Sequence, residues 1–165
     1  MSTVVTVNTN THTVTYVTTK LLYSLQTIIN GIGLDPAALT RQWSDLEEGL
    51  STWLESRDLI EVFLEVFSPT TGKLVTRWDL EIVYGYTGDG SLWTDPWPIK
   101  YAIQKAGCDP AGCDYSIIIH TKPGAKSLPG WSPVDFKSTN GLKRFCLGST
   151  IGGNGIASEA AYWSR

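Results

Sequence analysis

Residues 59–84, LIEVFLEVFSPTTGKLVTRWDLEIVY, indicate the fold more clearly than any other segment. Successive side chains of a strand point to opposite faces, and Leu59–Phe67 has the alternation that this geometry requires. One face would carry Ile60, Val62, Leu64 and Val66, and the other Glu61, Phe63, Glu65 and Phe67. Ser68–Gly72 has the composition of a turn, and the alternation resumes from Lys73 to Tyr84. The segment therefore predicts an antiparallel hairpin.

Two amphipathic helices are predicted before this hairpin. The first has apolar residues at spacings of three and four and ends at Gly31 or Gly33; these residues are Val14, Val17, Leu21, Leu25, Ile28 and Ile32. Asp35 followed by Pro36 is typical of a helix start. The second apolar stripe consists of Leu39, Trp43, Leu46, Leu50, Trp53 and Leu54. Two such helices need a common apolar surface, and one face of the hairpin provides it.

A third helix and a third strand follow the hairpin. Residues 85–94 are rich in Gly, Asp and Ser and predict a loop. Asp95 can cap a short helix whose inward side chains are Ile99, Ala102, Ile103 and Ala106. The segment 114–121 contains Ile117-Ile118-Ile119, an apolar run that favours a central or covered strand. The fold class is therefore α+β, with three helices on an antiparallel sheet.

The last quarter of the chain has a different character. Residues 122–133 contain three Pro residues and surround Trp131, which predicts a loop longer than a hairpin turn. Three strands are then expected, at Val134–Ser138, Leu142–Ile151 and Ile156–Trp163. They are rich in Gly, Ser and Ala and alternate weakly, so their pairing register is poorly specified. We expect these strands to be mobile.

Composition and length are those of one globular domain covering residues 1–165. The chain is 42% hydrophobic and 18% charged, outside the disordered range. We expect residues 1–11, which carry no charged side chain, to form a flexible arm, and residues 12–121 to form the core. No run of 18 apolar residues and no signal-peptide pattern is present, so no membrane partner is expected. Three cysteines, an odd number, favour the reducing cytoplasm.

Charge is distributed unevenly along the chain. Residues 1–119 have 7 Lys or Arg against 14 Asp or Glu, a net charge of −7, and residues 120–165 have 6 against 2, a net charge of +4. The basic residues 120–165 could dock on the acidic residues 1–119 or bind an acidic partner. The uneven distribution could also have arisen by chance. Basic residues beside Trp131 and Trp163 also allow a nucleic-acid-contacting module, but the net charge of −3 argues against binding outside a complex.

Motifs for catalysis are largely absent. Cys108, Cys113 and Cys146 with His120 could make a zinc site, but the spacing is loose and ordinary thiols are the better interpretation. Asp79 and Glu81 could act as paired carboxylates, although Arg77 beside them favours salt links on a solvent-facing surface. Gly148–Gly155 is glycine-rich but precedes no predicted helix, so a flexible turn is favoured over a phosphate site. We expect no enzyme, metal or cofactor, and retain a small enzyme with a scattered site only as a minor alternative.

The ordered set of segments resembles HORMA domains, which include the mitotic checkpoint adaptor, and is most similar to their bacterial relatives. The resemblance covers Leu46–Leu54, the strand 59–67, and Thr76–Ile82 with its Arg77-Trp78 pair. It continues through Ser116–Thr121, the loop ending in Trp131, and Ser138–Ile151. It therefore spans nearly the whole chain and implies a HORMA fold without enzymatic activity. It also implies that residues 122–165 form the mobile "safety belt" of a peptide-binding switch.

The resemblance implies partners and site residues as well. A closure-motif peptide would add as a strand to the edge formed by Ser116, Ile117, Ile118, Ile119, His120 and Thr121, with Trp131 beside it. Ile117 and Ile119 would then face one side and Ile118 with His120 the other. A hexameric AAA+ ATPase would reopen the closed form by pulling on Thr3, Val4, Val5, Thr6 and Val7. In bacterial relatives the closed form activates a cGAS-like nucleotidyltransferase of the antiphage CBASS system.

Overall fold

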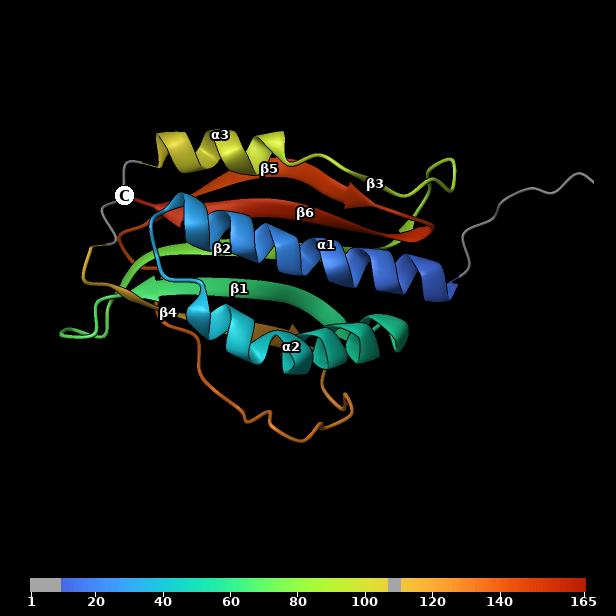
Figure 1. Cartoon of the computed structure of the whole chain (residues 1–165), viewed down its shortest axis with the longest axis horizontal. Helices are drawn as coiled ribbons and strands as arrows, with labels where there is room; N and C mark the ends of the chain where they lie inside the picture. The colour runs from blue at the N-terminus through green and yellow to red at the C-terminus, as the bar shows by residue number, and fades with distance from the viewer. Residues whose placement is uncertain (1–9, 107–110) are drawn as a thin grey trace, which may run out of the picture.

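The computed structural model describes residues 10–106 and 111–165 (Figure 1). The helices are α1 (Asn10–Gly31), α2 (Ala37–Glu55) and α3 (Trp97–Lys105). The strands are β1 (Leu59–Phe67), β2 (Leu74–Tyr86), β3 (Trp93–Thr94), β4 (Asp114–Thr121), β5 (Lys143–Gly152) and β6 (Gly155–Ser164). Residues 10 and 11 of the expected arm belong to α1, and the expected handle Thr3–Val7 lies outside the described residues.

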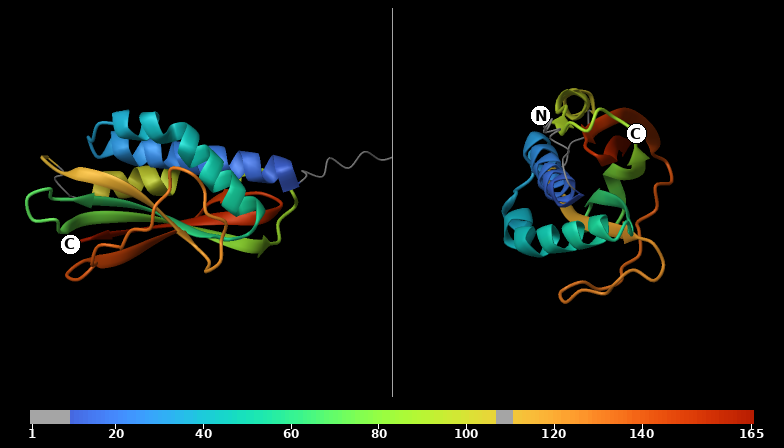
Figure 2. Two further views of the ribbon diagram at one scale, coloured as in Figure 1. Left: turned by 90° about the horizontal axis from the view of Figure 1, so that it is seen from below. Right: turned by 90° about the vertical axis from the view of Figure 1, so that its right-hand side faces the viewer.

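One antiparallel sheet carries the three helices on a single face, as predicted. The strand order is β3-β5-β6-β2-β1-β4. All three helices lie on the same side of the sheet, and none of the described residues forms a helix over the other side (Figure 2). We call this uncovered side the open face. The predicted hairpin is present, with Glu65 opposite Arg77 and Leu64 opposite Trp78.

The core lies between the helices and the sheet. α1 buries the predicted stripe completely at Val17, Leu21, Leu25 and Ile28. α2 begins one residue later than the Asp35-Pro36 pair predicts, since Pro36 and not Asp35 occupies the N-cap position; Asp35 Oδ1 accepts the Ala37 N–H at 2.9 Å from just before the helix. Among the described residues, no helix has the length and apolar character needed to cross a membrane.

β4 is a covered strand but not a central one. Its apolar run favoured a central or covered strand, and β4 lies at the sheet edge, where it pairs with β1 alone among the described strands. Ile118 is nevertheless buried, with 7% of its surface exposed. Because Phe63 lies opposite Ile118 and Phe136 packs on Phe63, side chains bury this residue without a further strand.

In the last quarter of the chain, one of the three predicted strands is absent and the other two are present. Val134–Ser138 is not a strand; residues 122–142, which we call the belt loop, contain no helix or strand. The two later strands are present as β5 and β6, and β6 lies between β5 and β2. Register shifts interrupt the β5–β6 pairing between Cys146 and Gly148 and between Ser149 and Ile151.

The expected loop 85–94 also contains a short strand. Its residues Trp93–Thr94 form β3, which pairs with β5.

Candidate functional site

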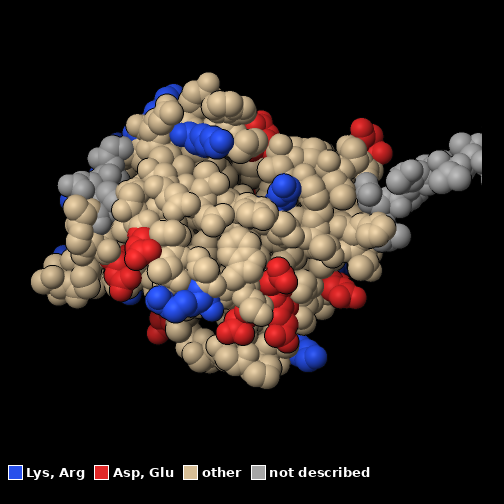
Figure 3. All heavy atoms as spheres, in the orientation of Figure 1, with Lys and Arg blue, Asp and Glu red and all other residues tan. Residues whose placement is uncertain are grey.

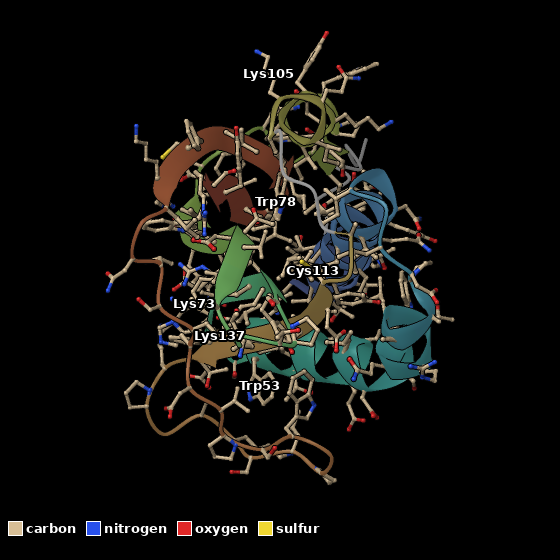
Figure 4. All side chains as sticks on the ribbon, turned by 90° about the vertical axis from the view of Figure 1, so that its left-hand side faces the viewer. Trp53, Lys73, Trp78, Lys105, Cys113 and Lys137 are labelled. Carbon is tan, nitrogen blue, oxygen red and sulfur yellow. The ribbon has the colours of Figure 1, made fainter. Side chains whose placement is uncertain are left out.

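A groove separates the free edge of β4 from the belt loop. The loop leaves β4 at Lys122, whose N–H donates to the Asp58 carbonyl at 2.8 Å. In Figure 4 it is the orange trace that curves around the outside of α2 and β4. The main cavity of the groove has a volume of about 420 Å³. Its walls come from β4 (117–121), from α2 (Gln42, Asp45, Leu46) and from the belt loop (130–134 and Phe136).

The side chains of β4 divide between the two faces of the sheet as predicted. Ile117 and Ile119 lie opposite Leu64 and Val62 and pack against the core beneath the helices. His120 lies on the open face, where its Nδ1 is 3.0 Å from Glu61 Oε1 and its ring stacks with Phe63. On the side away from β1 the backbone of β4 has no neighbour among the strands of residues 10–106 and 111–165, so it can accept a further strand.

The first attachment of the belt loop is on the helix side of the groove. Trp131 packs edge-on against Trp53, with the ring centroids 5.2 Å apart. Trp53 Nε1 donates to the Lys126 carbonyl at 2.9 Å, so the same residue holds two points of the loop. The indole of Trp131 also lies directly over Gly49, in the second half of α2. A glycine inside a helix costs about 0.5–1 kcal/mol relative to alanine, so this position needs a packing reason.

The second attachment is on the open face. Phe136 packs edge-on against Phe63, with centroids 5.0 Å apart, and against His120 at 5.3 Å. The next residue, Lys137, donates its backbone N–H to Glu65 Oε2 at 2.8 Å. The Lys137 ammonium lies 4.4 Å from the Phe67 ring centroid. The belt loop is therefore held on both sides of the sheet and encloses the β4 edge between its two attachments.

The groove continues along β4 toward the start of the strand. A second cavity of about 320 Å³ shares Gln42, Ile117, Ile118 and Val134 with the first. The buried carboxylate of Glu65 lines it together with Ser116 and Asp135. Tyr115 ties this end of β4 to the start of α2, because its hydroxyl donates to the Asp35 carbonyl at 2.6 Å and accepts from the Leu39 N–H of α2 at 3.4 Å. Burial raises the pKa of Tyr115, which keeps this donor protonated.

The structure brings all the predicted peptide-binding residues together. Ile117–Thr121 and Trp131 line the first cavity, and Ser116 lines the second. Sequence reasoning missed Gly49, Glu65 and Phe136. The helix-interior glycine was a usable signal, because α2 has no conformational need for it. Phe136 was not recognisable, since its segment was expected to form a strand.

The other chemical candidates have structural explanations. Asp79 is buried and accepts hydrogen bonds from Arg77 Nε at 2.8 Å and Trp163 Nε1 at 2.9 Å. Glu81 pairs with Arg144 at 2.8 Å; burial raises the Glu81 pKa, and Arg144 opposes that rise. These carboxylates are salt-linked as expected, although Asp79 is buried rather than solvent-facing. In the described ranges, no group of three or more His, Cys, Asp or Glu side chains could hold a metal ion. Cys108 of the considered zinc set lies outside those ranges.

Acidic side chains are concentrated on α2, next to the groove. α2 carries four acidic residues, Asp45, Glu47, Glu48 and Glu55, against one cation, Arg41. Acidic side chains gather over the part of the surface where α2 lies (Figure 3). The basic tail docks in part on the acidic body, since Arg144 of β5 reaches Glu81 of β2. This contact supports internal docking as one origin of the uneven charge.

Comparisons with known proteins agree with this architecture. Solved structures with the same fold include the Mitotic Checkpoint Complex, with 11% identity, a TM-score of 0.70, and coverage of 92% of this chain and 98% of the other. C. elegans HTP-1 bound to the HIM-3 closure motif has 10% identity, a TM-score of 0.75, and coverage of 96% and 92%. The E. coli MS115-1 CdnC:HORMA-deltaN complex has 15% identity, a TM-score of 0.63, and coverage of 94% and 89%.

No curated protein matches the chain. The family model described as Bacterial HORMA domain 2 matches residues 1–165. The chain belongs to the bacterial HORMA domain 2 family.

Proposed function

We propose that this protein is a peptide-binding signalling adaptor, and that its groove captures an extended peptide as a strand added to β4. The observation that carries the proposal is the outer edge of β4, which pairs with no strand in the described part of the chain and is enclosed by the belt loop. An edge strand offers a row of backbone donors and acceptors, which an added strand satisfies.

The walls of the groove favour a peptide whose side chains on the open face of the sheet are apolar. Val134 is 61% exposed and Phe136 is 45% exposed, and both line the main cavity. Exposed apolar groups in a concave site gain free energy when a ligand covers them. On the opposite side Asp45 and Gln42 face the cavity, so polar or basic side chains fit there.

The downstream role extends this proposal. Relatives of this fold are solved with closure motifs and with CdnC, which supports an adaptor that binds peptides and a partner enzyme. We infer that the peptide-bound form activates a cGAS-like cyclic-oligonucleotide synthase of a CBASS antiphage system in the cytoplasm. A hexameric AAA+ ATPase that engages Thr3–Val7 would reopen it. In this proposal the protein has no catalytic role of its own.

Peptide selection followed by hydrogen exchange tests peptide capture. Immobilised protein would be offered a random-peptide library displayed on phage, and one selected peptide would be synthesised. Its binding should slow amide exchange in Ser116–Thr121, because these groups would become paired. A peptide that binds without protecting this segment would show that β4 is not the docking edge.

Two further measurements make the assignment specific. Ile118→Pro should abolish peptide binding, because proline removes a backbone N–H and bends the strand. Circular dichroism must show that this variant is folded. If it is unfolded, the hydrogen-exchange experiment on the wild-type protein decides whether β4 is the docking edge. A salt titration separates the nucleic-acid alternative, because phosphate contacts weaken steeply with salt, whereas strand addition does not.

A further inference from the structure

The contact between Gly49 and Trp131 leaves no room for a side chain on the helix. Gly49 is buried near the middle of the second half of α2. A Cβ atom placed there would lie 2.7 Å from Trp131 Cζ2 and 3.0 Å from Trp53 Cζ3. Real Cβ contacts are essentially never shorter than 3.0 Å, so even alanine would displace the Trp131 indole.

Backbone conformation gives no reason for glycine at this position. Gly49 lies within a continuous α-helix, a conformation in which alanine is more stable than glycine. Its neighbour Leu50 continues the apolar stripe and is completely buried. The missing side chain therefore has a packing purpose, which is to form a slot for Trp131.

Trp131 connects this slot to the peptide groove. Its backbone N–H donates to the Leu128 carbonyl at 3.3 Å, and Leu128 is itself buried, so residues 128–131 form a compact turn against α2. Trp131 also lines the main cavity together with Ile117 and Ile119. One indole therefore fixes the belt loop on α2 and forms part of the groove wall.

We propose that Gly49 is a positioning residue that acts through Trp131, and that the two form a latch that holds the belt loop over the groove. When the latch is open, the loop can swing away from β4 and a peptide can enter or leave. The effect on the loop is independent of the proposed function, whereas the effect on peptide exit rests on it.

Gly49→Ala tests the latch. Helix propensity alone predicts a more stable protein, whereas loss of the latch predicts faster opening of the belt loop. Alanine favours the helix, so urea unfolding should show unchanged or greater global stability. Displacement of Trp131 should nevertheless raise amide exchange of residues 125–133 at least tenfold in the free protein. Glu47→Ala, an exposed change two residues away, is the matched control and should leave loop exchange unchanged.

A rescue experiment separates the latch from a general packing defect. Trp131→Phe removes the part of the ring that meets the added methyl group. Gly49→Ala combined with Trp131→Phe should therefore exchange more slowly than Gly49→Ala alone. In a Trp131→Ala background, Gly49→Ala should not accelerate loop exchange further, because the two changes disrupt one contact. Equal acceleration in both backgrounds, or no acceleration in the wild-type background, would overturn the proposal.

Peptide kinetics distinguish this proposal from the proposed function. For a peptide selected on the wild-type protein, Gly49→Ala should accelerate dissociation at least tenfold, since a trapped peptide leaves when the loop opens. Unchanged dissociation combined with faster loop exchange would show that the latch does not control exit and would overturn that part. If no peptide can be selected, the proposed function fails while the exchange result still decides whether the latch exists.

Discussion

Phe136→Ala should release the belt loop on the open face and leave the rest of the fold intact. Phe136 makes the main apolar contact of this attachment, through edge-on packing on Phe63 and His120. Its neighbour Lys137 adds one backbone hydrogen bond to Glu65. The loop lies outside the helices and the sheet, so its release should occur as local opening rather than global unfolding.

The expected magnitude follows from exposure. Full burial of a Phe side chain stabilises by roughly 1.5–3 kcal/mol, and Phe136 is 45% exposed, so its burial contributes about 1 kcal/mol. The aromatic contacts add about 1 kcal/mol. A loss of about 2 kcal/mol changes the ratio of closed to open loop about thirty-fold.

Hydrogen exchange of residues 132–140 measures this ratio directly. Phe145→Ala is the matched control, because Phe145 is 41% exposed and stacks on Tyr162 with centroids 4.9 Å apart, outside the belt loop. Phe136→Ala should accelerate exchange in 132–140, and Phe145→Ala should not. The same global destabilisation in both variants, with no local difference at 132–140, would refute the two-sided attachment.

Three other predictions concern residues around the groove and the arm. Glu65→Ala leaves the Lys137 N–H without its acceptor, so belt-loop opening should become easier by about 1–3 kcal/mol, measured by exchange at Lys137–Asn140 against Glu47→Ala as control. Burial raises the pKa of Tyr84 to about 12, so its contribution to stability is complete below the unfolded value near 10 and is lost as pH rises through 12. Measured by urea unfolding, the free energy of unfolding of Tyr84→Phe should fall less than that of the wild-type protein over this alkaline range. The same pH dependence in both proteins would contradict the prediction. Deleting residues 1–9 should preserve peptide binding and prevent reopening by an AAA+ ATPase; normal reopening would exclude the arm as the handle.

Local patterns were sufficient to predict the helices and the hairpin. The stripe from Val17 to Ile28 and the alternation of Leu59–Phe67 each follow from one element meeting one apolar surface. The helix start near Asp35 could be predicted to within one residue, because the Asp35 carboxylate accepts from an N–H only two residues away. The interactions behind these predictions lie within one element or between neighbouring elements.

Non-local contacts account for what the sequence did not predict. Ile117–Ile119 has the composition of a central strand because the helices cover one of its faces and Phe63 with Phe136 the other. Nothing within that segment indicates the absence of a second strand neighbour. Phe136 likewise resembles a strand residue, yet it packs on the sheet face through its ring. The Gly49–Trp131 contact joins residues far apart in the chain, and only the folded structure places them together.

The start of α1 contacts both β3 and the turn between β5 and β6. Tyr16 bonds to Thr94 of β3 at 2.8 Å, and the methyl group of Thr13 approaches Gly153 in the β5–β6 turn so closely that a Cβ would not fit. Among the described residues the Thr13 hydroxyl has no hydrogen-bond partner, and a buried group of this kind costs about 1–3 kcal/mol. Unwinding the first turn of α1 would therefore break the Thr13 contact with the β5–β6 turn and return this hydroxyl to water. A force applied to the residues before α1 would act first on the contacts of Thr13 and Tyr16 with the β5–β6 turn and β3, while the α1 residues packed on α2 would remain in place.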